Sequence, residues 1–396
     1  MACVPEMEIQ ERIGSLQKLL VAEGVDAALI TQNADLFYFT GAVNRAYFYI
    51  PAVGEPILFI ARGAERLHDE TTVRRVVVLN HVKEMPSALR QMNCLFPERL
   101  GVESDVIPAS LFFRYESIFS PARLVDVSAL IRRVRSKKSA WEIEKIRDAC
   151  KMGRSIFNFV ENAWTEGLTE FELCGKIESF ARKIGHPGLM RARGYNQEMS
   201  YVLILSGVDA VLPSYNSGPL GGKGATAAFP YGPSNRCIMR NEPVIVDQSP
   251  WVEGYMADMT RVFVRGNLPV HMCQAYETAR IIQEMIVEKA RPGAVCSELW
   301  SAARQIVRTH GFCEHFMGMM RQVPFVGHGV GLEVDEWPVI GPGADTVLAE
   351  GMVLAIEPKF VFPDGAVGLE NTFVVGKKGL ETLVDMDDEI RQLRGY

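Results

Sequence analysis

The chain has 396 residues, of which 48% are hydrophobic and 23% are charged, and its net charge is −6. This composition is typical of a globular protein with a large core, and the length allows two domains. The negative charge disfavours nucleic acid as the main partner, because phosphate binding needs a basic surface. We also expect no membrane partner, since no segment has the roughly 20 consecutive apolar residues that cross a bilayer.

The cysteines and the N-terminus predict a cytoplasmic protein. Eight cysteines are spread along the chain without a CxxC pair, which is typical of reduced, buried thiols and disfavours a zinc–thiolate site. Residues 1–10 include two glutamates and lack the basic and apolar pattern of a secretory signal.

The first third of the chain alternates helical and strand-like patterns. Residues 9–23 carry apolar side chains at helical spacing. Short apolar runs typical of strands follow at 27–30, 56–60, 76–79, 100–102 and 124–127. This alternation predicts an α/β domain with a mostly sequential sheet.

A basic stretch at 132–139 separates this region from the rest, and we interpret it as a solvated linker. The domain boundary is therefore placed between residues 135 and 136. Ser139 precedes Glu142 by three residues, the pattern of a capping box, and amphipathic helices are predicted at 141–161 and 169–184.

Two predicted strand hairpins each carry a pair of acidic residues. Asp247 ends the apolar run 244–246, and Asp258 lies on the strand that returns after the turn. In the second hairpin, Glu357 follows a buried apolar strand and Glu370 follows the return strand. One carboxylate at a strand end is more often a turn or cap residue, but a buried one is costly unless it is paired, hydrogen-bonded or bound to metal.

His328 lies between the hairpins and is flanked by Gly327 and Gly329, which would let a metal and the backbone approach closely. Four carboxylates and one imidazole suit hard or borderline divalent ions, such as manganese, cobalt, zinc or iron. Four negative charges are too many for one catalytic ion with open positions. Two ions roughly 3.5–4 Å apart would use them, so the pattern predicts a dinuclear metal centre.

These motifs resemble the M24 "pita-bread" metallopeptidase family, in particular Xaa-Pro dipeptidases (prolidases), Xaa-Pro aminopeptidases and creatinase. The resemblance is carried by the motifs at 247–261, 327–332, 357–358 and 370, and extends to 33–41 and 136–147. It implies a creatinase-like α/β N-terminal domain at 1–135, followed by an α+β pita-bread catalytic domain at 136–396. It further implies a homodimer with a small peptide or peptide-like substrate.

The resemblance also implies a role for each ligand. Asp247 would bind one metal, His328 and Glu357 the other, and Asp258 and Glu370 would bridge both. A metal-bridging hydroxide would attack the substrate carbonyl, with Glu357 as the catalytic group that takes and returns the proton. The function implied is that of a dinuclear metal-dependent hydrolase, an Xaa-Pro dipeptidase or aminopeptidase.

Three positions depart from the family pattern. Where these peptidases usually carry two substrate-side histidines, this chain has Ser214 and Asp335, and where an arginine commonly lies two residues before the final glutamate it has Gly368. The histidines are the groups expected to stabilise the oxyanion. An ionised Asp335 would instead favour a cationic group or act as a base.

The substrate side therefore keeps alternatives open. We expect Asp335 to be catalytic, and Ser214, Tyr215 and Trp337 to bind substrate. The leading hypothesis is a peptidase. The alternative is a metal-dependent non-peptidase of the same fold, a C–N hydrolase or lyase that uses Asp335 as base on a small, cationic substrate. A non-catalytic binding module is disfavoured, because a binding surface has no use for five retained ligands.

Overall fold

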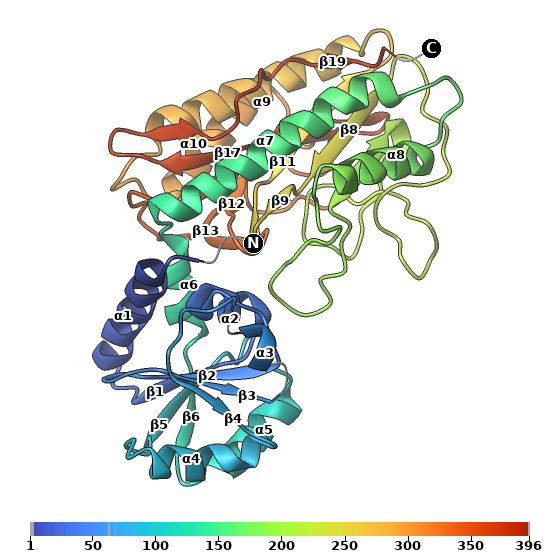
Figure 1. The fold of residues 1–396 in the computed structure, drawn as a ribbon. Helices are drawn as coiled ribbons and strands as arrows, with labels where there is room; N and C mark the ends of the chain where they lie inside the picture. The colour runs from blue at the N-terminus through green and yellow to red at the C-terminus, as the bar shows by residue number, and fades with distance from the viewer. Residues whose placement is uncertain (1–3, 62–63, 68, 395–396) are drawn as a thin grey trace. The chain divides into compact units, whose positions relative to one another are not determined.

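The computed structural model describes residues 4–61, 64–67 and 69–394. The chain divides into two compact units, Met1–Arg135 (unit 1) and Ser136–Tyr396 (unit 2), each drawn in Figure 1. In the parts of the chain that the structure describes, no helix combines the length and the apolar character needed to cross a membrane.

Unit 1 is built on a six-stranded mixed sheet in the order β4-β3-β2-β1-β5-β6. Its strands are β1 (Ala27–Ile30), β2 (Ala46–Pro51), β3 (Ile57–Ile60), β4 (Val76–Val78), β5 (Arg99–Val102) and β6 (Arg123–Asp126). Its helices are α1 (Glu6–Ala22), α2 (Asn33–Thr40), α3 (Ala64–Leu67), η1 (Val82–Glu84), α4 (Met85–Gln91), α5 (Ala109–Phe119) and α6 (Ser128–Ser136). The predicted strand runs correspond to five of these strands; β2 was not predicted, although its aromatic run has a high strand propensity.

The basic stretch at 132–139 is not the solvated linker that its charges suggest. Within unit 1, Arg135 is buried on α6 and its Nη1 lies 2.7 Å from Oδ1 of the buried Asp35. Within unit 2, Lys138 is also buried, with its Nζ 2.9 Å from Oε2 of Glu336. The prediction was wrong because the carboxylates that allow these charges to be buried lie far away in the sequence.

The first half of unit 2 places two helices against a four-stranded sheet in the order β19-β11-β8-β7 (Figure 1). The elements are α7 (Ala140–Ala163), α8 (Glu170–Lys183), β7 (Val202–Ser206), η2 (Gly207–Val211), β8 (Pro243–Gln248), β9 (Trp251–Val252), β10 (Tyr255–Met256), β11 (Met259–Val264) and β19 (Arg391–Gln392). The predicted capping box is present at the start of α7, where Ser139 Oγ accepts the Glu142 N–H and the Glu142 side chain accepts the Ser139 N–H. Helix α7 packs on β9–β11 and α8 packs on β7.

The second half contains a five-stranded antiparallel sheet in the order β13-β12-β14-β17-β18 and a separate β15–β16 hairpin. Its elements are α9 (Val270–Lys289), α10 (Cys296–Thr309), β12 (Gly327–Gly329), β13 (Glu336–Ile340), β14 (Val353–Ile356), β15 (Lys359–Phe362), β16 (Gly365–Gly368), β17 (Asn371–Val375) and β18 (Leu380–Thr382). Helix α9 packs on the β15–β16 hairpin and α10 packs on β13. The apolar faces of these elements form one buried core, and strand ends from both halves of unit 2 carry the predicted metal ligands.

Candidate metal centre

The two aspartates come from the first pair of strands. Strands β8 and β11 are antiparallel, with Asp247 opposite Thr260, and Asp258 directly precedes β11. The backbone N–H of Asp258 donates to Thr372 Oγ1 at 3.0 Å, and that hydroxyl donates to the Asp258 carbonyl at 2.9 Å. Ser249 Oγ donates to Asp258 Oδ1 at 3.3 Å. The position of Asp258 is therefore fixed through both its backbone and its side chain.

The two glutamates lie at the open end of the β15–β16 hairpin, one before β15 and one after β16. Glu370 forms an isolated bridge with Thr260, in which each backbone N–H donates to the other residue's carbonyl at 3.2 Å. Thr260 Oγ1 also donates to Glu370 Oε2 at 2.9 Å. These bonds join β11 to the segment that carries Glu370, so the carboxylates of both halves meet.

His328 lies on β12, between β13 and β14. A Cβ at Gly327 would lie 2.6 Å from the Ala355 carbonyl oxygen, and one at Gly329 would lie 2.2 Å from the Trp337 carbonyl oxygen. Both distances are too short for a side chain. The flanking glycines are therefore required by the close approach of the neighbouring strands, which is a different reason from the metal approach that we expected.

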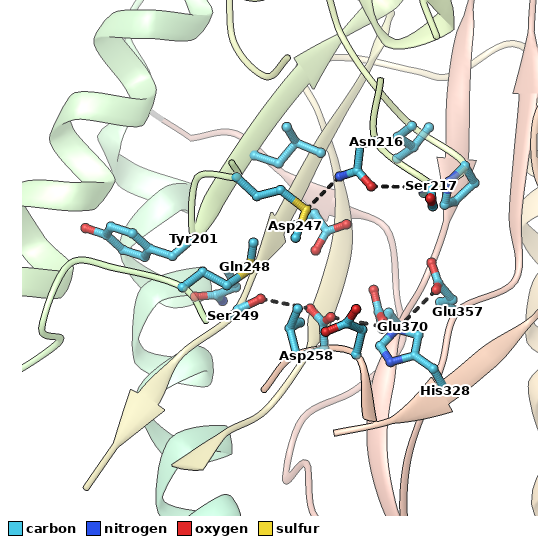
Figure 2. Close-up of a pocket in the computed structure, with 18 of the residues that line it drawn as sticks. Tyr201, Asn216, Ser217, Asp247, Gln248, Ser249, Asp258, His328, Glu357 and Glu370 are labelled. Atoms are coloured by element: carbon cyan, nitrogen blue, oxygen red, sulfur yellow. Dashed lines mark hydrogen bonds and ion pairs between the residues drawn. The ribbon is translucent and has the colours of Figure 1, made fainter. Parts of the chain in front are cut away.

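All five predicted ligands line one pocket within unit 2. His328 Nε2 lies 3.3 Å from Glu357 Oε1, 3.9 Å from Glu370 Oε1 and 4.0 Å from Asp258 Oδ2. Figure 2 shows these four side chains pointing toward one another. One ligand atom each from Asp258, His328 and Glu370 lies within 4.8 Å of the others, a spacing that could hold one metal ion.

Lys359 also lies in this cluster, and its place there was not predicted from the sequence. Its Nζ is 2.7 Å from Glu357 Oε2, 2.8 Å from Glu370 Oε2 and 3.3 Å from Asp247 Oδ2, and its side chain is 2% exposed. The signal in the sequence is a lysine between Glu357-Pro358 and an apolar strand run. If that strand is buried on both faces, the lysine side chain cannot reach solvent and must have buried partners.

Burial and mutual repulsion make four ionised carboxylates costly in this pocket. Burial, followed by the charges of neighbouring carboxylates, raises the pKa of Asp258 well above its usual range. Burial also raises the pKa of Glu370 to about 7, against the opposing charge of Lys359. Burial acts in the same direction on Glu357, but the charge of Lys359 and the hydrogen bond from His328 lower its pKa to about 2. Positive charge is therefore needed to keep the cluster ionised.

One side of the cluster fits a divalent ion. Glu370 Oε1 is buried and has no hydrogen-bond partner among the described residues, and an unsatisfied buried acceptor is costly. It lies close to His328 Nε2 and, with Asp258, offers the mixed oxygen and nitrogen donors that manganese, iron, cobalt and zinc accept. On the other side of the cluster, the Lys359 ammonium lies between Asp247, Glu357 and Glu370 and donates to all three carboxylates.

Of the residues predicted on the substrate side, one lines the pocket and three are not among its described lining residues. Asp335 lines the pocket, and its Oδ1 accepts the Arg193 N–H at 3.0 Å. Burial raises the pKa of Asp335, and this hydrogen bond opposes the rise. Ser214, Tyr215 and Trp337 are not among the described lining residues, and the Tyr215 side chain is 48% exposed. A substrate-binding role for these three residues stays a prediction from the sequence.

Other pocket residues were not predicted. The glycine-rich segment at 217–224 contributes Ser217, Gly218 and Pro219, and Asn216 precedes it. The pocket is also lined by apolar side chains, which we call its apolar wall: Met190, Met199, Leu203, Leu220, Phe325, Val334 and Val339. A pocket with a charged centre and an apolar wall is suited to a small ligand that has one polar reacting group and an apolar side chain.

Known relatives cover nearly the whole chain. Over 386 residues, 29% are identical to the Xaa-Pro dipeptidase of Pyrococcus horikoshii, with 96% of this chain and 99% of that relative covered. The crystal structure of the prolidase from the same organism has a TM-score of 0.80 at 27% identity, covering 96% of this chain and 99% of the other. The Xaa-Pro dipeptidase structure from Bacillus anthracis has a TM-score of 0.82 at 21% identity, covers 97% of this chain and 100% of that one, and so shows a shared fold.

The family models agree with these relatives. The creatinase/prolidase N-terminal domain matches residues 12–137, and metallopeptidase family M24 matches residues 144–377. The predicted order of a creatinase-like N-terminal domain and a pita-bread catalytic domain is confirmed, as is the predicted enzyme class. The chain belongs to metallopeptidase family M24.

Proposed function

We propose that the protein is a metal-dependent peptidase that cleaves Xaa-Pro peptides. The observation that carries the proposal is the convergence of Asp258, His328, Glu357 and Glu370 around one pocket with an apolar wall, in a chain of this metallopeptidase family. Relatives named Xaa-Pro dipeptidase, which match nearly end to end, support proline as the residue after the scissile bond.

Different residues of the pocket would bind the metal and accept the proton. A divalent ion held by Asp258, His328 and Glu370 would lower the pKa of water toward neutrality and so supply a nucleophile. Glu357 has a pKa lowered to about 2, chiefly by Lys359 acting against burial, and is therefore ionised at neutral pH, the form in which a carboxylate can accept a proton, although so low a pKa makes it a weak base. It lies 3.3 Å from His328 Nε2, at the side of the ligand cluster.

The pocket favours a substrate with an apolar reacting end. The apolar wall can cover a proline ring or a hydrophobic first residue, since both lose water on burial. Among the described lining residues, only His328 and Lys359 are basic, and both contact the carboxylates. A free C-terminal carboxylate would find no side-chain cation of its own there. We therefore expect peptides extended beyond proline to be cleaved at least as fast as Xaa-Pro dipeptides.

The finer properties of the protein are also proposals. Manganese, cobalt, zinc and iron all suit the donor set, and availability would decide among them. The five-ligand pattern supports two ions, whereas the position of Lys359 supports one. The family resemblance supports a homodimer, which light scattering on the purified protein would test. The composition and cysteine pattern support the cytoplasm.

The direct test is hydrolysis of Xaa-Pro dipeptides and of longer Xaa-Pro peptides by EDTA-treated protein with and without Mn²⁺ or Co²⁺. We expect metal-dependent release of the N-terminal residue. Asp258→Ala is the matched inactive control, and the alanine-for-proline peptides control for specificity. Bound metal without cleavage of any peptide would overturn the proposal. It would favour a non-peptide substrate, on which Asp335, inside the pocket, would act as base.

A further inference from the structure

We propose that Lys359 takes the place of one metal ion of the expected pair, so that the centre binds a single divalent ion beside a built-in ammonium group. This inference rests on the proposed function only in requiring that the centre bind metal. It concerns the number of ions, which the family membership of the chain does not decide.

The position of the Lys359 ammonium carries the argument. Its Nζ lies within 2.7–3.3 Å of carboxylate oxygens of Glu357, Glu370 and Asp247, and it is almost fully buried. A divalent ion needs carboxylate oxygens at about 2.0–2.2 Å. An ion bound to both Asp247 and Glu370 would therefore have to occupy the space between these carboxylates that the ammonium already holds. Because Lys359 donates to all three carboxylates, it satisfies the oxygens that such an ion would bind.

The charges lead to the same result. The four carboxylates carry four negative charges when ionised. One ammonium and one divalent ion leave a net charge of −1, and a second divalent ion would bring it to +1. The second ion would also lie beside the buried ammonium, where little water screens the repulsion, and this repulsion favours a single ion.

Gly368 accounts for the position of the cation, Lys359, on strand β15. It pairs with Lys359 across the β15–β16 hairpin. A Cβ at 368 would lie 2.6 Å from the Pro358 carbonyl oxygen and 2.7 Å from both Cα and Cγ of Lys359. The arginine common at position 368 in the family would therefore clash with the backbone of this hairpin as it is built here. In this structure the cation that contacts the carboxylates is instead Lys359, on the opposite strand β15.

The remaining ion has a defined place. Glu370 uses Oε2 for Lys359, while its buried Oε1 has no hydrogen-bond partner among the described groups. The donor atoms of Asp258 and His328 lie beside it, all within 4.8 Å of one another. The two oxygens of Glu370 thus divide the centre into an ammonium side and a metal side.

The test is the number of Mn²⁺ ions bound per chain. EDTA-treated protein is dialysed against graded Mn²⁺, bound metal is measured by mass spectrometry, and the Mn²⁺ electron paramagnetic resonance spectrum is recorded. We expect one ion per chain and the six-line spectrum of isolated Mn²⁺. A second ion is expected to bind at least roughly 1,000-fold more weakly, because that factor already corresponds to two unit charges about 4 Å apart at an effective dielectric constant of 20, and the ion carries two charges.

Variants make the test specific to Lys359. Lys359→Ala is expected to bind two ions with a spin-coupled spectrum. Lys138→Ala is the matched control, since it also removes a buried lysine that pairs with a carboxylate, Glu336, and it is expected to keep one ion. The wild-type measurement stands by itself if Lys359→Ala does not fold.

Two tightly bound, spin-coupled Mn²⁺ ions in the wild type would overturn the inference, whether or not peptides are cleaved. One bound ion with no peptide cleavage would overturn the proposed function and leave the inference standing. No bound Mn²⁺ would overturn both.

Discussion

Replacing Lys359 by methionine should destabilise the metal-free protein. Methionine has a similar length, but it leaves Asp247, Glu357 and Glu370 without the ammonium that lies 2.7–3.3 Å from their oxygens. Removing one partner of a buried ion pair costs about 3–5 kcal/mol. We expect the lower end, about 3 kcal/mol at pH 7, because the carboxylates can take up protons once the ammonium is lost.

The assay is chemical unfolding of EDTA-treated protein followed by tryptophan fluorescence. All five tryptophans lie between residues 136 and 396, so the signal reports on unit 2 alone. Adding Mn²⁺ should stabilise the variant more than the wild type, because the variant gains a second cation position. At 100 times the dissociation constant of that position, the extra stabilisation is about 2.7 kcal/mol.

Lys377→Met, which removes an exposed lysine from unit 2, is the control and should change stability by less than about 0.5 kcal/mol. A loss below about 1 kcal/mol for Lys359→Met in metal-free protein, with no extra response to Mn²⁺, would refute the reasoning. It would mean that the ammonium does not balance the carboxylates.

Four further results are expected. Asp258→Ala should abolish Mn²⁺ binding measured by dialysis, since it removes one of the three donors on the metal side; retained binding would contradict that ligand set. Gly368→Ala should lower the free energy of unfolding by about 1–3 kcal/mol, because its Cβ would lie 2.6 Å from a backbone carbonyl oxygen, and an unchanged unfolding midpoint would show that the hairpin can relax. Asp388→Asn should cost about 1–3 kcal/mol, as it weakens the 3.0 Å pair with the fully buried Arg261, while its own partial exposure reduces the loss. Burial lowers the pKa of His186, so the unfolded chain binds a proton at a higher pH than the folded chain does, and the free energy of unfolding falls as the pH drops below about 6.5. His186→Gln should make this fall less steep in unfolding curves measured from pH 7.5 to 5.5. An equal slope in both proteins would contradict the assignment.

Local patterns predicted much of the fold. The capping box at Ser139 and Glu142 fixed the start of α7, because it depends only on residues three apart. Five strands of unit 1 followed from short apolar runs. The buried partners of Arg135 and Lys138 could not be predicted, because each lies about 100 residues or more away in the sequence.

Some residues of the candidate site could likewise be predicted from the sequence, and others could not. The sequence predicted that Asp247, Asp258 and Glu370 share one site, since each follows or precedes an apolar strand and matches a motif, and all three line the pocket. Their role as metal ligands stays a prediction. Lys359 was missed, because a lysine next to an apolar run carries no sign of where its ammonium points. Its role follows from the hairpin register that places it opposite Gly368, and from carboxylates that converge only in the folded chain.

The most direct test of the central claim is the rate at which EDTA-treated protein releases the N-terminal residue from an Xaa-Pro peptide as Mn²⁺ is added. We expect no release without metal and a rate that saturates at one Mn²⁺ per chain, with none in Asp258→Ala. Equal rates with and without metal, or no release at any Mn²⁺ concentration, would contradict the assignment of a metal-dependent Xaa-Pro peptidase.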